Sequence, residues 1–203
     1  MEGYKLDKET INKLPLCRFK GRISIVEEEE DVNQIVEKLS KEKVIGFDTE
    51  TKPSFKKGVR NSIALVQLST MNEAYLIRVH HTGYPDSLVQ LFNNPNVIKV
   101  GVGIRDDLRG LNRVIKFKPK AFVEMQDVAK KLGINTISLK ALSAIFLEKR
   151  VSKRQRLSNW EATELSRGQI EYAAIDAWVG VKIYNKLLYL YPEFEPFYFT
   201  LKK

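Results

Sequence analysis

Strand-length apolar runs dominate the first half of the sequence, and helical patterns follow and separate them. The composition of these runs predicts strands within residues 21–26, 44–50, 62–70, 74–79, 96–104 and 121–126. The runs at 62–70 and 74–79 are separated only by a short polar segment, which predicts an antiparallel hairpin around Met71–Glu73.

Helical spacing of apolar residues predicts a helix capped near Asp31, because Val32, Ile35, Val36 and Leu39 recur on one face. Further helices are predicted at 86–92, 105–115, around 127–132, at 138–147 and at 167–190. Strands that include a hairpin, followed by alternating helix and strand, indicate an α/β domain with a mixed central sheet flanked by helices. The hairpin argues against a purely parallel, doubly wound sheet.

The chain has 203 residues, no repeat and no linker, so we expect one main domain. A net charge of +9 is compatible with a polyanionic partner. Cys17 stands alone, which excludes an intramolecular disulfide and fits a reducing compartment. Without a signal peptide or an apolar run of about 20 residues, we expect an intracellular protein of the cytoplasm or nucleoid that enters no membrane. The oligomeric state is not indicated.

Two acids end the predicted strand "VIGFDTE". Asp48 and Glu50 are two residues apart, so both side chains point to the same face of the sheet. Functional sites of α/β sheets lie at strand ends. We therefore interpret this pair as part of a site rather than as packing residues.

A second acidic position lies in "GVGIRDDLRG", at the start of the predicted helix 105–115. Helical phase places Asp107 with Leu111 on the face toward the sheet, and Asp106 with Arg113 toward solvent. Capping of the helix by these acids is the competing explanation. The glycines suggest a dinucleotide motif, but the third glycine is missing at the required spacing.

The segment "EYAAIDAWVG" carries a third acidic position, because Tyr172 and Asp176 share one face of the predicted long helix. A buried carboxylate needs a partner, and convergence of Asp176 with Asp48, Glu50 and Asp107 would require divalent charge. Carboxylates and water are the ligands that Mg²⁺ prefers. Two such ions are a common device for attack on a phosphodiester. Tyr172 is positioned to hold the attacking water, with plain aromatic packing as the alternative.

At "FDTE", "GVGIRDDL" and "YAAIDA" the sequence resembles the DEDD 3′–5′ exonucleases of the ribonuclease H-like fold, in their tyrosine subgroup. It is most similar to the Werner-syndrome-type exonuclease domain and more distantly to ribonuclease D. The similarity runs from about Ile23 to Leu190 and includes "RLSNWEATELSRGQIEYAAIDAWVGVKIY". It implies an exonuclease domain at 23–203, preceded by an N-terminal extension at 1–22.

The resemblance implies that Asp48, Glu50, Asp107 and Asp176 bind two Mg²⁺ or Mn²⁺ ions. Tyr172 would orient the water that releases a nucleoside 5′-monophosphate from a free 3′ end. DNA is favoured as substrate. The alternatives are a ribonuclease D-like enzyme that trims structured RNA and, in another class, a non-catalytic nucleic-acid-binding module. An intact set of four acids and a tyrosine favours the enzyme.

Basic segments beside these motifs suggest contacts with the nucleic-acid backbone, since cations neutralise phosphates and aromatic rings stack on bases. The alternative is a solvated basic loop with a core tryptophan. Contacts of this kind carry little sequence specificity. The residues that we assign to substrate binding are Thr49, Lys56, Arg60, Arg154, Arg156 and Trp160.

Overall fold

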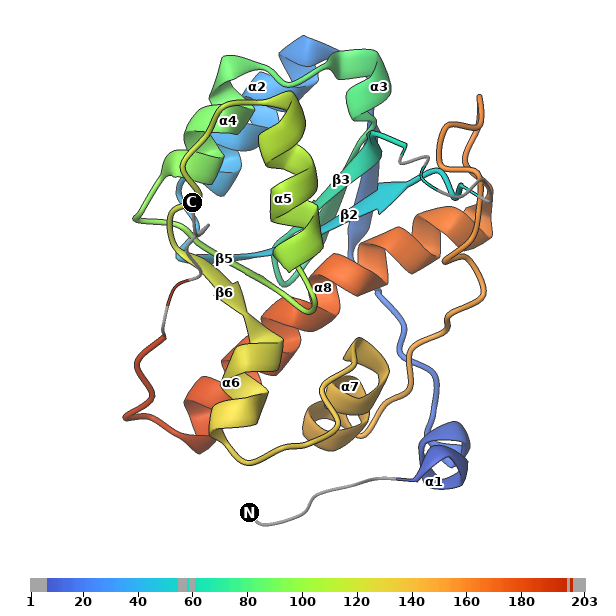
Figure 1. The fold of residues 1–203 in the computed structure, drawn as a ribbon, viewed down its shortest axis with the longest axis vertical. Coiled ribbons are helices and arrows are strands. Elements are labelled where there is room, and N and C mark those ends of the chain that lie inside the picture. Colours follow the sequence, from blue (N-terminus) through green and yellow to red (C-terminus); the bar gives the residue numbers. More distant parts are fainter. Residues whose placement is uncertain (1–6, 55–57, 59–60, 197, 199–203) are drawn as a thin grey trace.

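A central six-stranded sheet with helices on both faces forms the molecule (Figure 1). The computed structural model describes residues 7–54, 58, 61–196 and 198. The strands are β1 (Arg22–Val26), β2 (Val44–Thr51), β3 (Ile63–Ser69), β4 (Glu73–Ile77), β5 (Ile98–Gly101) and β6 (Phe122–Glu124).

The strand order is β1-β4-β3-β2-β5-β6. Strand β3 pairs antiparallel with both β2 and β4, whereas β1 with β4, β2 with β5, and β5 with β6 are parallel pairs. The mixed sheet and its antiparallel hairpin are thereby confirmed. The hairpin turn is fixed by Thr70, whose hydroxyl accepts from the backbone N–H of Glu73 at 3.0 Å.

Helices connect and cover the strands. Within the described residues they are α1 (Lys8–Lys13), α2 (Glu29–Leu39), α3 (Val79–Thr82), α4 (Asp86–Asn93), α5 (Arg105–Val114), α6 (Met125–Lys131), α7 (Leu139–Leu147) and α8 (Arg167–Leu190).

Helix α2 starts earlier than the sequence predicted, and two short helices were not predicted. Helix α2 begins at Glu29 with Glu28 as its N-cap, so Asp31 lies inside the first turn and does not cap it. Acidic residues in the first turn favour this earlier start, because they interact well with the positive end of the helix dipole. The short helices α1 and α3 were not predicted, since six and four residues show too little apolar periodicity.

The two faces of the sheet carry separate cores. Helices α2, α4 and α5 pack on one face, where Leu111 of α5 and Phe47 of β2 belong to the same apolar core. Helices α6, α7 and α8 cover the other face, where Val179 of α8 and Val100 of β5 belong to a second apolar core. Helix α5 lies on the first face and α6 on the second, so the chain passes from one layer to the other at the edge strand β6.

Helix α8 approaches β2 unusually closely. A Cβ atom added to Gly46 would lie 2.1 Å from the carbonyl oxygen of Ala177, so only glycine fits there. The start of α8 is fixed by a capping box, in which Ser166 and Gln169 satisfy each other's backbone N–H groups. These two features set how near α8 lies to β2 and which residues of α8 face it.

The described residues before β1 pack against the segment around α7. The N–H of Cys17 donates to the carbonyl of Arg150 at 2.8 Å, and Lys140 of α7 donates to the Asn12 side chain at 2.6 Å. In the described part of the chain, no helix has the length and apolar character needed to cross a membrane.

Candidate active site

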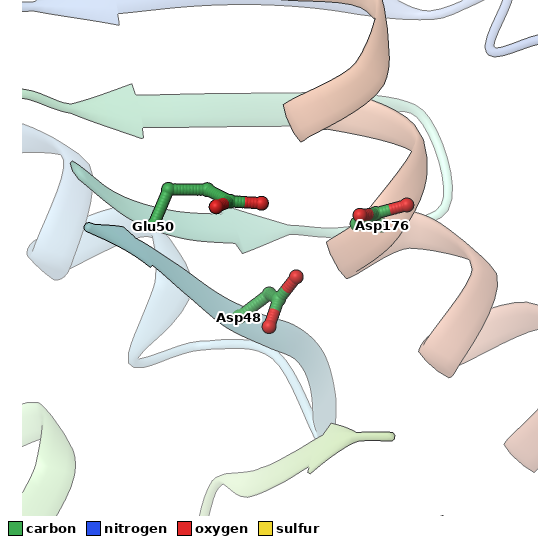
Figure 2. Close-up of side chains that lie close together, drawn as sticks. All are labelled: Asp48, Glu50 and Asp176. Atoms are coloured by element: carbon green, nitrogen blue, oxygen red, sulfur yellow. The ribbon is translucent and has the colours of Figure 1, made fainter. Parts of the chain in front are cut away.

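Three carboxylates from two elements meet above the centre of the sheet. Asp48 and Glu50 stand on the α8 face of β2, and Asp176 projects from α8. One oxygen from each lies within 4.8 Å of the others, and Figure 2 shows the three side chains directed at a common space. Alternation along β2 and the close approach at Gly46 together produce this cluster.

Asp107 lies beside the cluster, in the first turn of α5. Its carboxylate accepts a hydrogen bond from the hydroxyl of Thr49. Asp106 points to solvent with 91% of its side chain exposed and pairs with Arg109 at 2.9 Å, as helical phase predicts. The structure thus brings three of the four predicted acids into one group. It holds the fourth, Asp107, next to them through the hydrogen bond from Thr49 of β2.

Burial acts on all four acids, and repulsion within the group adds to it at Asp48 and Glu50. Burial, followed by the charges of Asp107, Asp176 and Glu50, raises the pKa of Asp48 well above its ordinary value. Burial raises the pKa of Glu50 to about 9, with further contributions from Asp176 and Asp107. Burial also raises the pKa of Asp107 to about 6 and that of Asp176 to about 7. Without compensating positive charge, the group therefore retains protons near neutral pH.

The Tyr172 hydroxyl is the partner that Asp176 requires on its own helix. It donates to the Asp176 carboxylate, and this hydrogen bond lowers the pKa of Asp176 against the effect of burial. Burial and the Asp176 charge raise the pKa of Tyr172, so the phenol keeps its proton. The Tyr172 ring is only partly buried, and its ring centroid lies 5.9 Å from that of Trp160.

A pocket of about 200 Å³ opens over the acids and is closed on one side by the segment between α7 and α8. Lys153 and Arg156 of that segment line it, together with Tyr172. The charge of Arg156 lowers the pKa of Glu50, and that of Lys153 lowers the pKa of Asp176. Cations thus face the acids across a small cleft.

The predicted substrate residues fall in different places. Arg156 lines the acidic pocket, whereas Arg154 lines a neighbouring groove. Thr49 is 8% exposed and donates its hydroxyl to Asp107. Lys56 and Arg60 lie outside the described residues.

Trp160 requires a correction. The prediction that it contacts substrate is wrong for direct base stacking, because the side chain is fully buried at 0% exposure. It packs with Leu65 of β3, Leu76 of β4 and Ala173 of α8, against which the Tyr172 ring also rests. Trp160 therefore helps to hold Tyr172 in position from the core side.

Two residues of the site were not assigned from the sequence. Lys153 faces the acids, but nothing in the sequence separates it from the other basic residues of its segment. Gln67 of β3 stands opposite Asp48 in the sheet register, and its buried amide atoms have no partner among the described residues. A glutamine alone in the apolar run "IALVQLS" is the signal that marks it, since buried amides are normally paired.

The residues present fit divalent cations. In the part of the chain that the structure describes, Asp48, Glu50 and Asp176 are the only group of three or more acidic, histidine or cysteine side chains near enough to share an ion. Their donors are all carboxylate oxygens, which suit hard cations such as Mg²⁺ and Mn²⁺ rather than Zn²⁺. A mixed α/β fold with an oxygen-only acidic cluster fits a metal-dependent active site of a phosphodiester-cleaving nuclease.

Comparison with known proteins defines the family. Residues 23–190 match the family described as 3′-5′ exonuclease. The chain is 36% identical over 186 residues to mouse bifunctional 3′-5′ exonuclease/ATP-dependent helicase WRN, covering 87% of this chain and 13% of that protein. It is 30% identical to an Arabidopsis thaliana 3′-5′ exonuclease, covering 91% of this chain and 69% of that protein. The chain belongs to the 3′–5′ exonuclease family.

Solved structures agree on the fold. The exonuclease domain of Aedes aegypti Nibbler superposes with a TM-score of 0.76 at 20% identity, covering 95% of this chain and 94% of that chain. Escherichia coli RNase D superposes with a TM-score of 0.75 at 20% identity, covering 82% of this chain and 44% of that chain. The fold is ribonuclease H-like, as expected from the sequence.

Proposed function

We propose that this chain is a metal-dependent 3′–5′ exonuclease that removes nucleoside 5′-monophosphates from the free 3′ end of a nucleic acid. The observation that carries this proposal is the group of Asp48, Glu50 and Asp176 within 4.8 Å of one another. Acids this close, with raised pKa values, are stable as anions only beside a strong positive charge. Membership of the exonuclease family supports the same reaction.

Asp48, Glu50, Asp107 and Asp176 would hold two Mg²⁺ or Mn²⁺ ions. When bound, such ions supply positive charge that neutralises the acids and stabilises the charge developing on the phosphate. Thr49 holds the Asp107 carboxylate toward β2. The Tyr172 hydroxyl, now directed at Asp176, is the group that would orient the attacking water by a hydrogen bond.

Lys153 and Arg156 are suited to the phosphate of the terminal nucleotide, because both line the pocket above the acids. Contacts of this kind are independent of base identity. Of the two substrates we favour DNA over RNA. The chain is more similar to the mouse exonuclease/helicase, at 36% identity, than to the exoribonuclease RNase D of E. coli, at 20% identity.

The test is a degradation assay on 5′-labelled single-stranded, recessed and blunt DNA beside RNA of matched sequence, with Mg²⁺ or Mn²⁺. Stepwise shortening from the 3′ end with release of 5′-monophosphates is expected, and chelation should abolish it. Asp48→Ala should be inactive yet folded. Asp106→Asn, a matched acid in solvent, should retain activity.

The outcomes separate the alternatives. Hydrolysis that survives exhaustive chelation overturns the metal-dependent mechanism. Faster degradation of RNA than of DNA replaces the DNA preference with a ribonuclease D-like activity. Binding without degradation under every metal condition identifies a non-catalytic module.

A further inference from the structure

A second, larger groove adjoins the acidic pocket. It has a volume of about 670 Å³ and lies between the N-terminal segment, the segment before α8 and the first turns of α8. Ser152 and Tyr172 line both spaces, so the groove continues directly from the acids. In Figure 1 the N-terminal chain passes from α1 to β1 across α8, and its residues line one groove with the segment that joins α7 to α8.

The charge of this groove suits a phosphodiester backbone. Its lining includes Arg18, Lys20, Arg154 and Arg167, against one acid, Glu171. The side chains of the four cations are exposed.

A further groove lies on the other side of the acids, and its described lining has fewer cations. It has a volume of about 710 Å³ and is lined by Lys52 and Arg113 against the three acids Glu50, Asp106 and Asp107. The four cations of the first groove therefore attract a nucleic-acid strand that leaves the acidic pocket along the N-terminal segment.

The N-terminal wall of the groove is held in place by the domain. Cys17 and Arg150 are joined through backbone hydrogen bonds, since the N–H of Cys17 donates to Arg150 at 2.8 Å and the N–H of Arg150 donates to Pro15 at 3.0 Å. Phe19 packs edge-on against Trp178 of α8, with ring centroids 5.4 Å apart. The cations on either side of Phe19 are thus carried by an ordered segment.

We propose that residues Leu16–Lys20 form one wall of a binding site for the single strand that lies on the 5′ side of the scissile bond. This inference rests on the proposed function, which puts the 3′-terminal nucleotide over the acids. Arg18 and Lys20 contact backbone phosphates, and the apolar surfaces of Leu16 and Ile175 lie against bases. The groove volume of about 670 Å³ lies within the range of small-molecule sites, so we expect the groove to take a short stretch of one strand.

The experiment measures binding and turnover of the full chain with the double substitution Arg18→Ala/Lys20→Ala. Lys116→Ala/Lys118→Ala is the matched control, because this double substitution removes the same charge from two exposed lysines between α5 and β6. The probes are a labelled dinucleotide and a labelled single strand of about 12 nucleotides, within the usual range of single-strand sites. Fluorescence anisotropy with Ca²⁺ gives Kd without requiring hydrolysis, and thermal unfolding checks that each variant is folded.

The groove variant should weaken binding of the long strand more than that of the dinucleotide. Its slope of log Kd against log salt should fall by about 1.4, at about 0.7 for each lost phosphate contact on a single strand. The control should keep the wild-type slope.

Three results would overturn the proposal. The first is an equal effect of the two double variants on Kd, and the second is an unchanged salt slope in the groove variant. The third is a loss of affinity that is the same for the dinucleotide and the long strand. Because anisotropy does not depend on cleavage, a wild-type chain that binds the long strand but degrades nothing refutes the proposed exonuclease activity and leaves the groove test valid.

Discussion

Asp176→Asn should stabilise the metal-free protein at neutral and alkaline pH. Asp176 is 7% exposed, and burial raises its pKa from the ordinary 3.8 to about 7. Between those two pH values the folded state keeps a proton that the unfolded state has released. The free energy of unfolding of the wild type therefore falls as pH rises through this window. Above about pH 7 the titration of Asp176 changes it no further.

The magnitude follows from the two pKa values. A difference of about three pH units, at 1.36 kcal/mol each, gives an upper limit of about 4 kcal/mol. The neighbouring acids titrate together, so one substitution recovers about half of this, roughly 2 kcal/mol. For a chain of this size that corresponds to a rise in Tm of about 4–8 °C. Asparagine keeps an oxygen that accepts from the Tyr172 hydroxyl, so that hydrogen bond is not the source of the difference.

The assay is thermal and urea unfolding in a chelator at pH 4 and pH 8, with wild type, Asp176→Asn and Asp106→Asn. The gain for Asp176→Asn should appear at pH 8 and be nearly absent at pH 4. Asp106 is exposed, so its variant should differ from wild type by less than about 1 kcal/mol at both pH values. A pH-independent gain, or destabilisation at pH 8, would refute the argument that unpaired acidic charge opposes folding here.

Three further predictions concern single side chains. Asp107→Asn should be nearly inactive and Asp106→Asn close to wild type in kcat, while a reversed pair of phenotypes would show that the second motif is misaligned by one residue. Tyr172→Phe should lower kcat in single-turnover assays with little change in nucleic-acid binding, because the ring still packs and only the hydroxyl is lost; full activity would leave it a packing residue. Trp160→Ala should reduce the free energy of unfolding by about 3–5 kcal/mol in urea titrations, and an unchanged value would contradict its place in the core.

Local patterns determined much of this protein. The alternation of side chains along a strand is enough to put Asp48 and Glu50 on one face, and helical phase is enough to separate Asp107 from Asp106. Both follow from backbone geometry that any chain with these elements obeys. The hairpin, the mixed sheet and the long helix with Tyr172 above Asp176 follow from the same kind of pattern.

Contacts between distant segments decided the rest. An irregular segment folds across α8, and its path decides where its side chains lie. It puts Trp160 in the core. It also turns Lys153 and Arg156 toward the acids and Arg154 toward the neighbouring groove. Such a segment has no periodicity from which the direction of a side chain follows. The N-terminal segment is the clearest case, because residues Leu16–Lys20 join the candidate site only through their packing on Arg150 and Trp178. The sequence by itself determined which side chains share a face of one element, whereas tertiary packing determined which elements share a site.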